Sequence, residues 1–331
     1  MEGMNNPSKK PKQQKSGGKK KYKVRNWREY NQALVDRGKV MFWITEEAIR
    51  NWQEHEGKGK RGRPQQYSDT AIQTTLTVRE VFRLQLRQTE GFLVSILARV
   101  APALKAPDHS TLCIRAKTLP VAIRVRPVLS TPLHIVVDGT GAKVYGEGEW
   151  KVRMHGWSKR RMWKKLHIGI DEATGDILLG EVTGNETADG EMIPSLLRQM
   201  SEEQKIRQVS ADGAYDTRMC YEELMRRGIP VVAIPPRRGA RIWQHGNTET
   251  ARLPRDENLR RIRTVGRKRW KHEIGYHRRS MAENGMFRLK TIFSDKVRSR
   301  TFANQRTELL IRCRALNMMT LIGMPDSYVV V

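Results

Sequence analysis

The amino-acid sequence predicts an α/β fold, in which helices flank a mixed sheet, preceded by an all-α N-terminal region. Apolar residues at helical spacing fill residues 26–125, whereas short strand-like segments alternate with helical ones over 126–325. The first 25 residues are basic and nearly free of apolar side chains. At 331 residues the chain can bury a sizeable core, and two domains are expected.

Residues 1–25 are predicted to be a disordered basic arm, because they carry nine Lys or Arg and one acidic residue. The segment 45–54 opens with Thr and two Glu, which is typical of a helix start. Residues 57–64 (GKGKRGRP) predict a flexible basic linker. Its Arg61 and Arg63 resemble the pair that an AT-hook inserts into the minor groove of DNA, and a plain linker is the alternative.

The rest of the N-terminal region predicts three helices. Residues 68–100 carry helical apolar spacing, and Gly91 with the RQTE segment before it is expected to divide them into two helices. A third, short helix is expected over 110–119, and Arg115 lies on it. Three short helices with basic residues on the last are compatible with a DNA-binding helix-turn-helix. They could equally form a cap on the next domain.

Strands and helices alternate from residue 131 onward. Helices are expected at 189–200 and 221–227, and a long, irregular basic insertion near 237–272. Three antiparallel strands followed by alternating helices and strands is the element order of an RNase H-like fold. The strands are expected at 133–137, 166–170, 177–183, 206–211 and 229–234.

Two of these strands end in an Asp that precedes a Gly. Asp138 follows IVV, and Asp212 follows VSA. An Asp at a strand end is most often a turn residue, but the carboxyl edge of an α/β sheet is also where such folds bind ligands. Glu283, on a predicted helix across the sheet, could add a third carboxylate. Carboxylate oxygens suit Mg²⁺, and two such ions can catalyse phosphoryl transfer without a protein nucleophile.

The segment around the glutamate carries a regular polar pattern. Tyr276, Arg279, Glu283 and Lys290 stand at successive offsets of 3, 4 and 7. On one α-helix, at roughly 100° per residue, these side chains fall within about 60° of one another. Taken alone, such a stripe is most often a solvated face with an ordinary i, i+4 ion pair. The two strand-end aspartates favour a functional role instead.

The same pattern carries a family resemblance. The spacing Tyr276-x2-Arg279-x3-Glu283-x6-Lys290 matches, without departure, the Y-x2-R-x3-E-x6-K signature around the third acid of DDE transposases. The chain resembles a DDE-class transposase of a bacterial insertion sequence, and most closely the insertion-sequence-five family, from about residue 26 to 320. Supporting segments are NWREYNQAL at 26–34, IVVDGTG at 135–141, KRRMWKKLHI at 159–168 and ADGAYD at 211–216.

The resemblance implies an RNase H-like catalytic domain that uses two Mg²⁺ or Mn²⁺ ions. Asp138 would bridge the two metals, and Asp212 and Glu283 would each complete one metal site. These three carboxylates are therefore the expected catalytic and metal-binding residues.

The resemblance also implies DNA contacts next to the acids. Arg279 and Lys290 would contact phosphates or the frayed DNA end, and Tyr276 would orient the glutamate or stack on a base. The partners would be double-stranded DNA, namely the terminal inverted repeats of the element and its target. The active complex would contain a homodimer.

The composition agrees with a nucleic-acid partner. The chain has 62 Lys and Arg against 35 Asp and Glu, a formal charge of +27, which attracts polyanions. No apolar stretch reaches the about 20 residues of a membrane span, so no membrane contact is expected. Three widely spaced cysteines indicate reduced thiols, so we expect the protein in the bacterial cytoplasm, on the nucleoid.

Two further segments, 151–165 and 237–279, combine many basic residues with tryptophans. This combination suits a track for phosphates with bases stacked on the rings, whereas solvated charges and core tryptophans are the alternative. His167, on a predicted strand, is expected to be structural. The candidate DNA contacts in the first segment are Lys159, Arg160, Arg161, Lys164 and Lys165.

The predicted function is a DNA transposase that binds the ends of its element, cleaves them by metal-dependent phosphoryl transfer and joins the 3′-OH ends to target DNA. One rival is a nuclease of the same fold, such as a junction resolvase, which cuts DNA without joining it. The other is a DNA-binding protein derived from a transposase that has lost catalysis. The presence of all three acids and their basic partners argues against this second rival.

Overall fold

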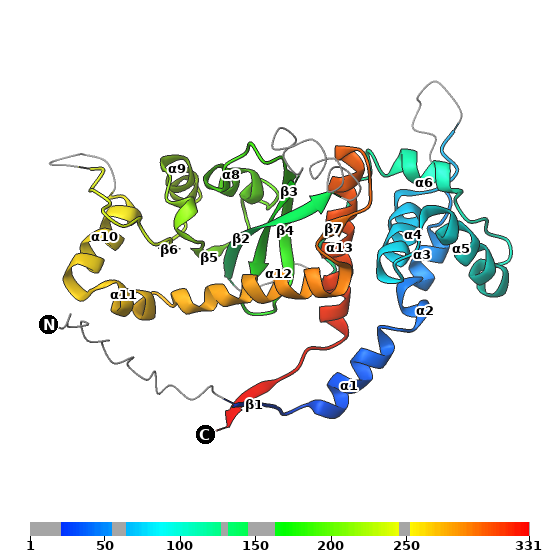
Figure 1. Ribbon diagram of the computed structural model, residues 1–331, viewed down its shortest axis with the longest axis horizontal. Coiled ribbons are helices and arrows are strands. Elements are labelled where there is room, and N and C mark those ends of the chain that lie inside the picture. The colour runs from blue at the N-terminus through cyan, green and yellow to red at the C-terminus, as the bar shows by residue number, and fades with distance from the viewer. Residues whose placement is uncertain (1–20, 55–63, 127–131, 145–162, 245–251, 331) are drawn as a thin grey trace, which may run out of the picture.

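The computed structural model describes residues 21–54, 64–126, 132–144, 163–244 and 252–330. At its centre lies a six-stranded mixed sheet in the order β4-β3-β2-β5-β6, with β7 also paired to β2 (Figure 1). Three antiparallel strands precede two parallel ones, which confirms the predicted α/β, RNase H-like fold. The strands are β2 (Leu133–Val144), β3 (Trp163–Asp171), β4 (Ile177–Thr183), β5 (Ile206–Ser210), β6 (Val231–Ala233) and β7 (Lys296–Val297).

The central strand β2 is longer than predicted. The sequence placed its end at Asp138, but the strand continues to Val144. The continuation is held by antiparallel pairing with β3, from Asp138 opposite Ile168 to Lys143 opposite Trp163. The Asp-Gly pair is therefore not a turn here.

Helices cover both faces of the sheet. Alternate residues of β2 face opposite ways, so Ile135 and Val137 pack with α8 and α9, whereas Val136 packs with α12 and α13. These helices are α8 (Met192–Leu197), α9 (Arg218–Arg226), α12 (Ser280–Phe293) and α13 (Phe302–Ile322). The helix predicted at 189–200 begins as a 3₁₀ turn, η1 (Asp189–Glu191), before α8.

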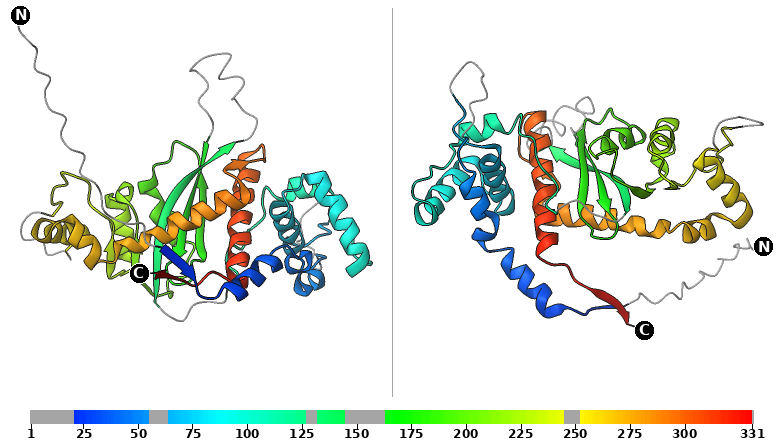
Figure 2. Two further views of the ribbon diagram at one scale, coloured as in Figure 1. Left: turned by 60° about the horizontal axis from the view of Figure 1, so that its bottom comes forward. Right: turned by 180° about the vertical axis from the view of Figure 1, so that it is seen from behind.

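The N-terminal helices lie on the far side of α13 from the sheet, as the views in Figures 1 and 2 agree. The division predicted at Gly91 is wrong, because Gly91 lies inside α5 and the break falls between Phe82 and Gln85. Arg83 makes this break with φ 53°, and its guanidinium donates to the Ile292 carbonyl at 2.6 Å. The helices are α1 (Trp27–Asp36), α2 (Val40–Trp43), α3 (Glu46–Arg50), α4 (Asp69–Val81), α5 (Leu86–Val100) and α6 (His109–Arg115).

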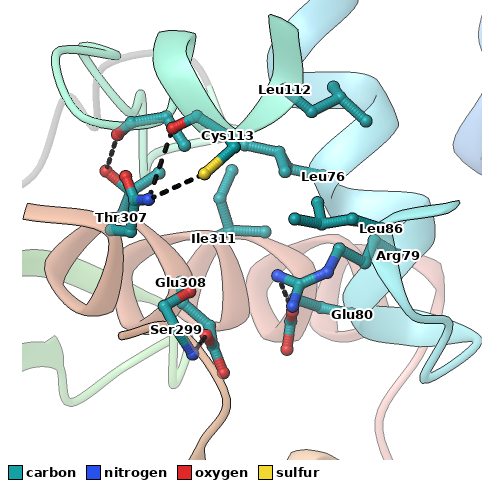
Figure 3. A pocket seen from close by; sticks show the side chains of 12 residues that line it. Leu76, Arg79, Glu80, Leu86, Leu112, Cys113, Ser299, Thr307, Glu308 and Ile311 are labelled. Atoms are coloured by element: carbon teal, nitrogen blue, oxygen red, sulfur yellow. Dashed lines mark hydrogen bonds and ion pairs between the residues drawn. The ribbon is translucent and has the colours of Figure 1, made fainter. Parts of the chain in front are cut away.

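A buried group of charges, here called the α4–α13 charge cluster, ties the N-terminal helices to the rest of the chain. Glu80 of α4 accepts hydrogen bonds from Arg312 Nε at 2.9 Å and Arg298 Nη2 at 2.6 Å. Arg79 and Glu308 complete the cluster, which borders a small pocket (Figure 3). Each carboxylate in it has an arginine partner, as buried charges require.

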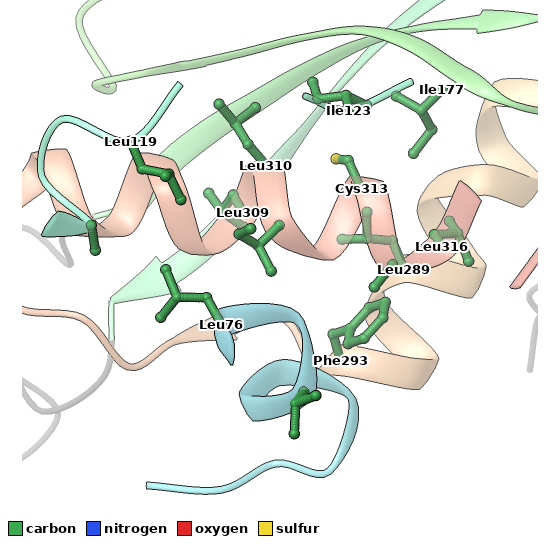
Figure 4. Close-up of a cluster of buried hydrophobic side chains, with 14 of the residues drawn as sticks. Leu76, Leu119, Ile123, Ile177, Leu289, Phe293, Leu309, Leu310, Cys313 and Leu316 are labelled. Carbon is green, nitrogen blue, oxygen red and sulfur yellow. The ribbon is translucent and has the colours of Figure 1, made fainter. Parts of the chain in front are cut away.

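Apolar packing crosses the same junction. Leu76 of α4 lies in one cluster with Leu309 and Leu316 of α13 and with Leu289 and Phe293 of α12 (Figure 4). Deeply buried side chains of this kind each contribute about 1.5–3 kcal/mol by leaving water. One hydrophobic core therefore spans the boundary predicted near residue 125.

From Pro254 onward the basic stretch 237–272 is helical, contrary to the irregular segment expected. Pro254 opens α10 (Pro254–Val265), with acidic residues in the first turn, and α11 (Arg267–Glu273) follows. The buried Arg255 anchors α10 by donating to Asp216 Oδ1 at 2.7 Å. An ion pair after the second predicted acid thus fixes the insertion to the sheet.

The end of the predicted basic arm is ordered. β1 (Lys21–Val24) pairs antiparallel with β8 (Ser327–Val330), a partner that lies some 300 residues away in the sequence. Residues 1–20 of the arm lie outside the described residues. Among the helices that the structure describes, none has the length and apolar character needed to cross a membrane.

Candidate active site

The first two predicted acids are brought together by neighbouring parallel strands. Val136 of β2 pairs in register with Ser210 of β5, so Asp138 and Asp212 each stand two residues beyond a matched pair. Neighbouring strands lie about 4.8 Å apart, and residues two apart share a face. Asp138 follows the face of Val136, which α12 covers.

Asp212 sits where β5 ends. Its backbone is extended, and its Oδ1 accepts the N–H of Ala214 at 2.8 Å, which caps the 3₁₀ turn η2 (Gly213–Tyr215). Here the turn role expected of a strand-end Asp is real. One side-chain oxygen makes this cap, and the other can bind a second partner.

Glu283 comes to the same place on α12. The helix lies close against the sheet because Gly285 faces Ile170, and a Cβ at this glycine would overlap the Ile170 side chain. Met286 and Leu289 add apolar contacts to the same core. Glu283 itself is 54% exposed, which leaves its carboxylate accessible from solvent.

Tyr276 and Arg279 do not lie on the same α-helix as Glu283, contrary to the predicted stripe. They form a 3₁₀ turn, η3 (Tyr276–Arg279), which leads into α12. Gly275 precedes the turn with φ 68°, a conformation that glycine adopts without strain. The tighter turn changes the direction of both side chains relative to Glu283.

Arg279 lies between two of the acids. Its guanidinium is 3.5 Å from Asp138 Oδ2 and also forms an ion pair with Glu283. The predicted i, i+4 ion pair between Arg279 and Glu283 is therefore present, and Arg279 also contacts Asp138 on the sheet. Arg279 is 20% exposed, so this contact is better shielded from solvent than an ordinary surface pair.

The three acids influence one another electrostatically. Burial raises the pKa of Asp138, and the charges of Asp212 and Glu283 raise it further. The N–H of Gly139 and the charge of Arg279 oppose this rise but do not cancel it. Among the described residues, the charge of Arg279 thus opposes the combined charge of the other two acids at Asp138.

The donor set fits a hard divalent cation, because every candidate ligand is a carboxylate oxygen. Within the part of the chain that the structure describes, no three His, Cys, Asp or Glu side chains stand close enough together to hold a metal ion. Arg279 occupies the space between Asp138 and Glu283 that a cation would share. Ligation by all three acids therefore requires Arg279 to give way.

A polar network below the acids holds η3 against the sheet. Arg278 forms an ion pair with Glu172, which follows β3 and is 9% exposed. Gln208 of β5 donates to the Ile274 carbonyl at 3.1 Å. These contacts were not predicted, because nothing in the spacing of the sequence links them. They fix the turn that carries Arg279.

Two buried polar atoms lie behind Asp138. His167 Nδ1 and Tyr215 Oη have no hydrogen-bond partner among the described residues. A Cβ at Gly139 would stand 3.2 Å from the first and 3.6 Å from the second, so a larger residue at this position would crowd both atoms. Burial lowers the pKa of His167 to about 4, and its Nε2 lies 3.0 Å from Thr183 Oγ1. The imidazole is neutral and structural, as expected.

The residues predicted to contact DNA differ in how many contacts they make within the protein. Lys290 is half-buried on α12, and Lys164 Nζ lies 4.9 Å from the Phe302 ring centre. Lys165 donates to the Thr187 carbonyl at 2.9 Å and to Asp189 at 3.1 Å. Arg115 bonds the Tyr67 carbonyl and Asp69, each at 2.6 Å, on the N-terminal side. Lys159, Arg160, Arg161, Arg61 and Arg63 lie outside the described residues.

Three aromatic rings in the segment expected to stack on bases already pack against other side chains of the protein. Trp270 is 1% exposed, and Trp243 packs under the guanidinium of Arg255 at 3.6 Å. Tyr276 is half-buried, with Lys271 Nζ 4.8 Å from its ring centre and the Trp270 ring 6.2 Å away. For the two tryptophans, the alternative of core packing is the correct one.

An RNase H-like domain with carboxylates on adjoining strands and on a helix across them is the architecture of polynucleotidyl transferases and endonucleases. Residues 129–318 match a family model described as "Transposase DDE domain", and residues 35–147 match a second model of the same description. The first match covers more than half of the 331 residues. The chain belongs to the DDE transposases. Membership of the insertion-sequence-five family is compatible with these matches and stays a prediction.

Proposed function

We propose that this protein binds the terminal inverted repeats of an insertion sequence, cleaves the ends and joins the resulting 3′-OH groups to target DNA. The observation that carries the proposal is the convergence of Asp138 and Asp212, through the β2–β5 register, with Glu283 of α12. Membership of the DDE transposases supplies DNA as the substrate class. The arrangement of the three acids supports metal-dependent phosphoryl transfer as the reaction.

The three carboxylates would hold two divalent cations, Mg²⁺ or Mn²⁺. Such ions, when bound, activate the attacking oxygen and stabilise the leaving 3′ oxygen of a phosphodiester. Asp138, which is 17% exposed on β2, would hold the ions together with Asp212 after β5 and Glu283 on α12. The cap on Asp212 and the packing of Gly285 would keep these side chains in place.

Arg279 is the residue that changes partner in this proposal. Its guanidinium pairs with Asp138 and Glu283. If these carboxylates held cations, the guanidinium would be free to bind a phosphate of the DNA, for which the planar group is well suited. Lys290 and Lys164 extend the basic surface beside it. The basic residues 159–161 and the Arg61–Arg63 pair would add phosphate contacts, and a homodimer would bring two ends together.

The test uses purified full-length protein, labelled duplexes that carry the element ends, and Mg²⁺. We expect nicked ends and, with a target plasmid, joined products from the wild type. Asp138→Asn should abolish both products and leave end binding intact. Glu203→Gln, which changes an exposed carboxylate after α8, is the matched control and should be fully active.

Each rival has its own signature in this experiment. A nuclease or resolvase would cut the ends but leave pre-cut ends unjoined. A catalytically inactive DNA-binding protein would shift the labelled duplexes and produce neither product. Unchanged cleavage by Asp138→Asn would overturn the assignment of the site.

A further inference from the structure

One side chain beside the acids has no role in the fold. Phe287 of α12 is 70% exposed, more than any other large apolar side chain that the structure describes. The buried face of α12 is complete without it, because Met286, Leu289 and Phe293 fill the core. Leaving a phenyl ring in water forgoes the free energy of burial, so an exposed ring at a functional site suggests a partner.

Phe287 lies on the same stripe of the helix as the third acid. It follows Glu283 by four residues and precedes Lys290 by three, spacings at which helical side chains stand about 5–6 Å apart at Cβ. Side chains on a helix lean toward its N-terminus, so the ring covers the turn that carries Glu283. An apolar surface thus lies between the carboxylate and a lysine.

The chemistry around Phe287 indicates that the partner is DNA. An intact duplex presents phosphates and sugars along its side, and these offer little to a phenyl ring. A nucleotide unpaired at a DNA end exposes the face of its base, on which aromatic side chains stack regardless of base identity. The flanking Lys290 and the +27 charge of the chain favour a polyanion over an apolar protein surface.

We propose that Phe287 is a stacking platform for an unpaired base next to the phosphate that the three acids act upon. This proposal rests on the proposed function, because it takes Glu283 as part of the active site. Tyr276 is less suited to the role, since Lys271 and Trp270 already lie against its ring. Phe287 is better suited to the role, because it is exposed and lies one helical turn from Glu283.

The test compares two DNA duplexes of the same end sequence in the absence of divalent metal. One ends in two unpaired nucleotides, and the other continues into flanking duplex. Phe287→Ala should bind the unpaired end about tenfold more weakly than wild type, as expected for loss of one stacked base, and the continuous duplex equally well. Phe287→Trp should retain the preference. Met219→Ala, a change at a 51% exposed residue of α9, is the control and should alter neither affinity.

Three results would overturn the proposal: equal affinities of Phe287→Ala and wild type for the unpaired end, an equal loss on both duplexes, or conversion of a DNA-free dimer to a monomer by Phe287→Ala. The last result would assign the ring to a subunit contact. Cleavage by wild type and by Asp138→Asn is measured in parallel with Mg²⁺. Failure of the site assignment then appears as cleavage insensitive to Asp138, whereas failure of the stacking role appears in binding alone.

Discussion

Two groups of carboxylates in this protein differ in how their charge is balanced. In the α4–α13 charge cluster, Glu80 and Glu308 are matched by three arginines, 79, 298 and 312. At the edge of the sheet, Arg279 is the one arginine among the described residues that pairs with the three acids, and it contacts Asp138 and Glu283. The five side chains of the first group carry a net charge of +1, whereas the three acids together with Arg279 carry −2.

The difference appears in the pKa values. Burial raises the pKa of Glu80, but Arg312, Arg79 and Arg298 more than offset it, so its pKa lies below the ordinary value of 4.5. Burial raises the pKa of Asp138, and Arg279 does not offset it. An acid group that the protein itself neutralises stabilises the fold, whereas one left unbalanced is suited to bind a cation.

The same substitution should therefore have opposite consequences in the two groups. Glu283→Gln should lower DNA cleavage by about a thousandfold or more, because a bound metal supplies several kcal/mol of transition-state stabilisation and 1.36 kcal/mol is tenfold in rate. Its unfolding free energy should stay within about 0.5 kcal/mol of wild type, since Glu283 is 54% exposed. Cleavage of labelled ends and urea unfolding measure the two effects.

Glu80→Gln should instead lower the unfolding free energy by about 3–5 kcal/mol, because it removes the buried carboxylate that pairs with Arg79, Arg298 and Arg312. Urea unfolding followed by circular dichroism measures this loss. Cleavage per folded molecule, at a temperature where the variant is folded, should equal that of wild type. Stable protein with no cleavage would contradict the division into a structural and a functional group.

Two arginines of equal exposure allow a finer comparison. Arg279 and Arg298 are each 20% exposed, and each contacts an acid of its own group. Arg279→Ala should raise the affinity for Mn²⁺ in the absence of DNA about fivefold, roughly 1 kcal/mol, because the competing cation is gone. Arg298→Ala should destabilise the protein and leave Mn²⁺ affinity unchanged.

Titration calorimetry or the paramagnetic resonance of free Mn²⁺ measures this affinity without any cleavage. An Arg279→Ala variant that binds Mn²⁺ no better than wild type would show that the guanidinium does not compete for the site. Arg279 and Arg298 would then differ in where they lie, but neither would compete with a metal ion for its acid.

The sequence predicted the sheet and the three acids because both leave local signals. Apolar segments of strand length predicted β4 at its observed bounds, and the spacing around Glu283 picked out the helix that crosses the sheet. The extension of β2 beyond Asp138 was missed, since it depends on pairing with β3 and not on local preference. The 3₁₀ turn at Tyr276 was missed because its direction is set by distant partners of Arg278 and Ile274.

The charge cluster was hidden from the sequence for a similar reason. Glu80 and Arg312 are separated by 232 residues, and neither stands in a recognisable motif. The exposure of Phe287 was also not predictable, since composition does not show which apolar residues of a helix stay exposed. Long-range pairing and exposure are properties of the folded chain.

The smallest expected effect separates the two groups by their response to acid. His134 of β2 lies below the acids, 6% exposed, with Nε2 2.8 Å from Ser210 Oγ. Burial lowers its pKa from 6.5 to about 4, assisted by the charges of Arg207 and Arg278 and opposed by Asp171. Glu172 Oε2 lies 3.7 Å from its Nδ1, but that carboxylate is already paired with Arg278, so the imidazole stays neutral.

The unfolded chain binds a proton at this imidazole below pH 6.5, whereas the folded chain binds one only near pH 4. The contribution of neutral His134 to the free energy of unfolding is therefore complete above pH 6.5 and decreases as the pH falls from 6.5 to 4. Glu80 has a lowered pKa, so its contribution is present above its ordinary 4.5 and is lost only below it. Urea unfolding at closely spaced pH values should thus show an early decline that His134→Gln reduces and a later one that it leaves unchanged. A His134→Gln profile parallel to that of wild type from pH 6.5 to 4 would contradict the role of His134 and assign the early decline to another buried imidazole, such as His167 of β3, whose pKa burial also lowers to about 4.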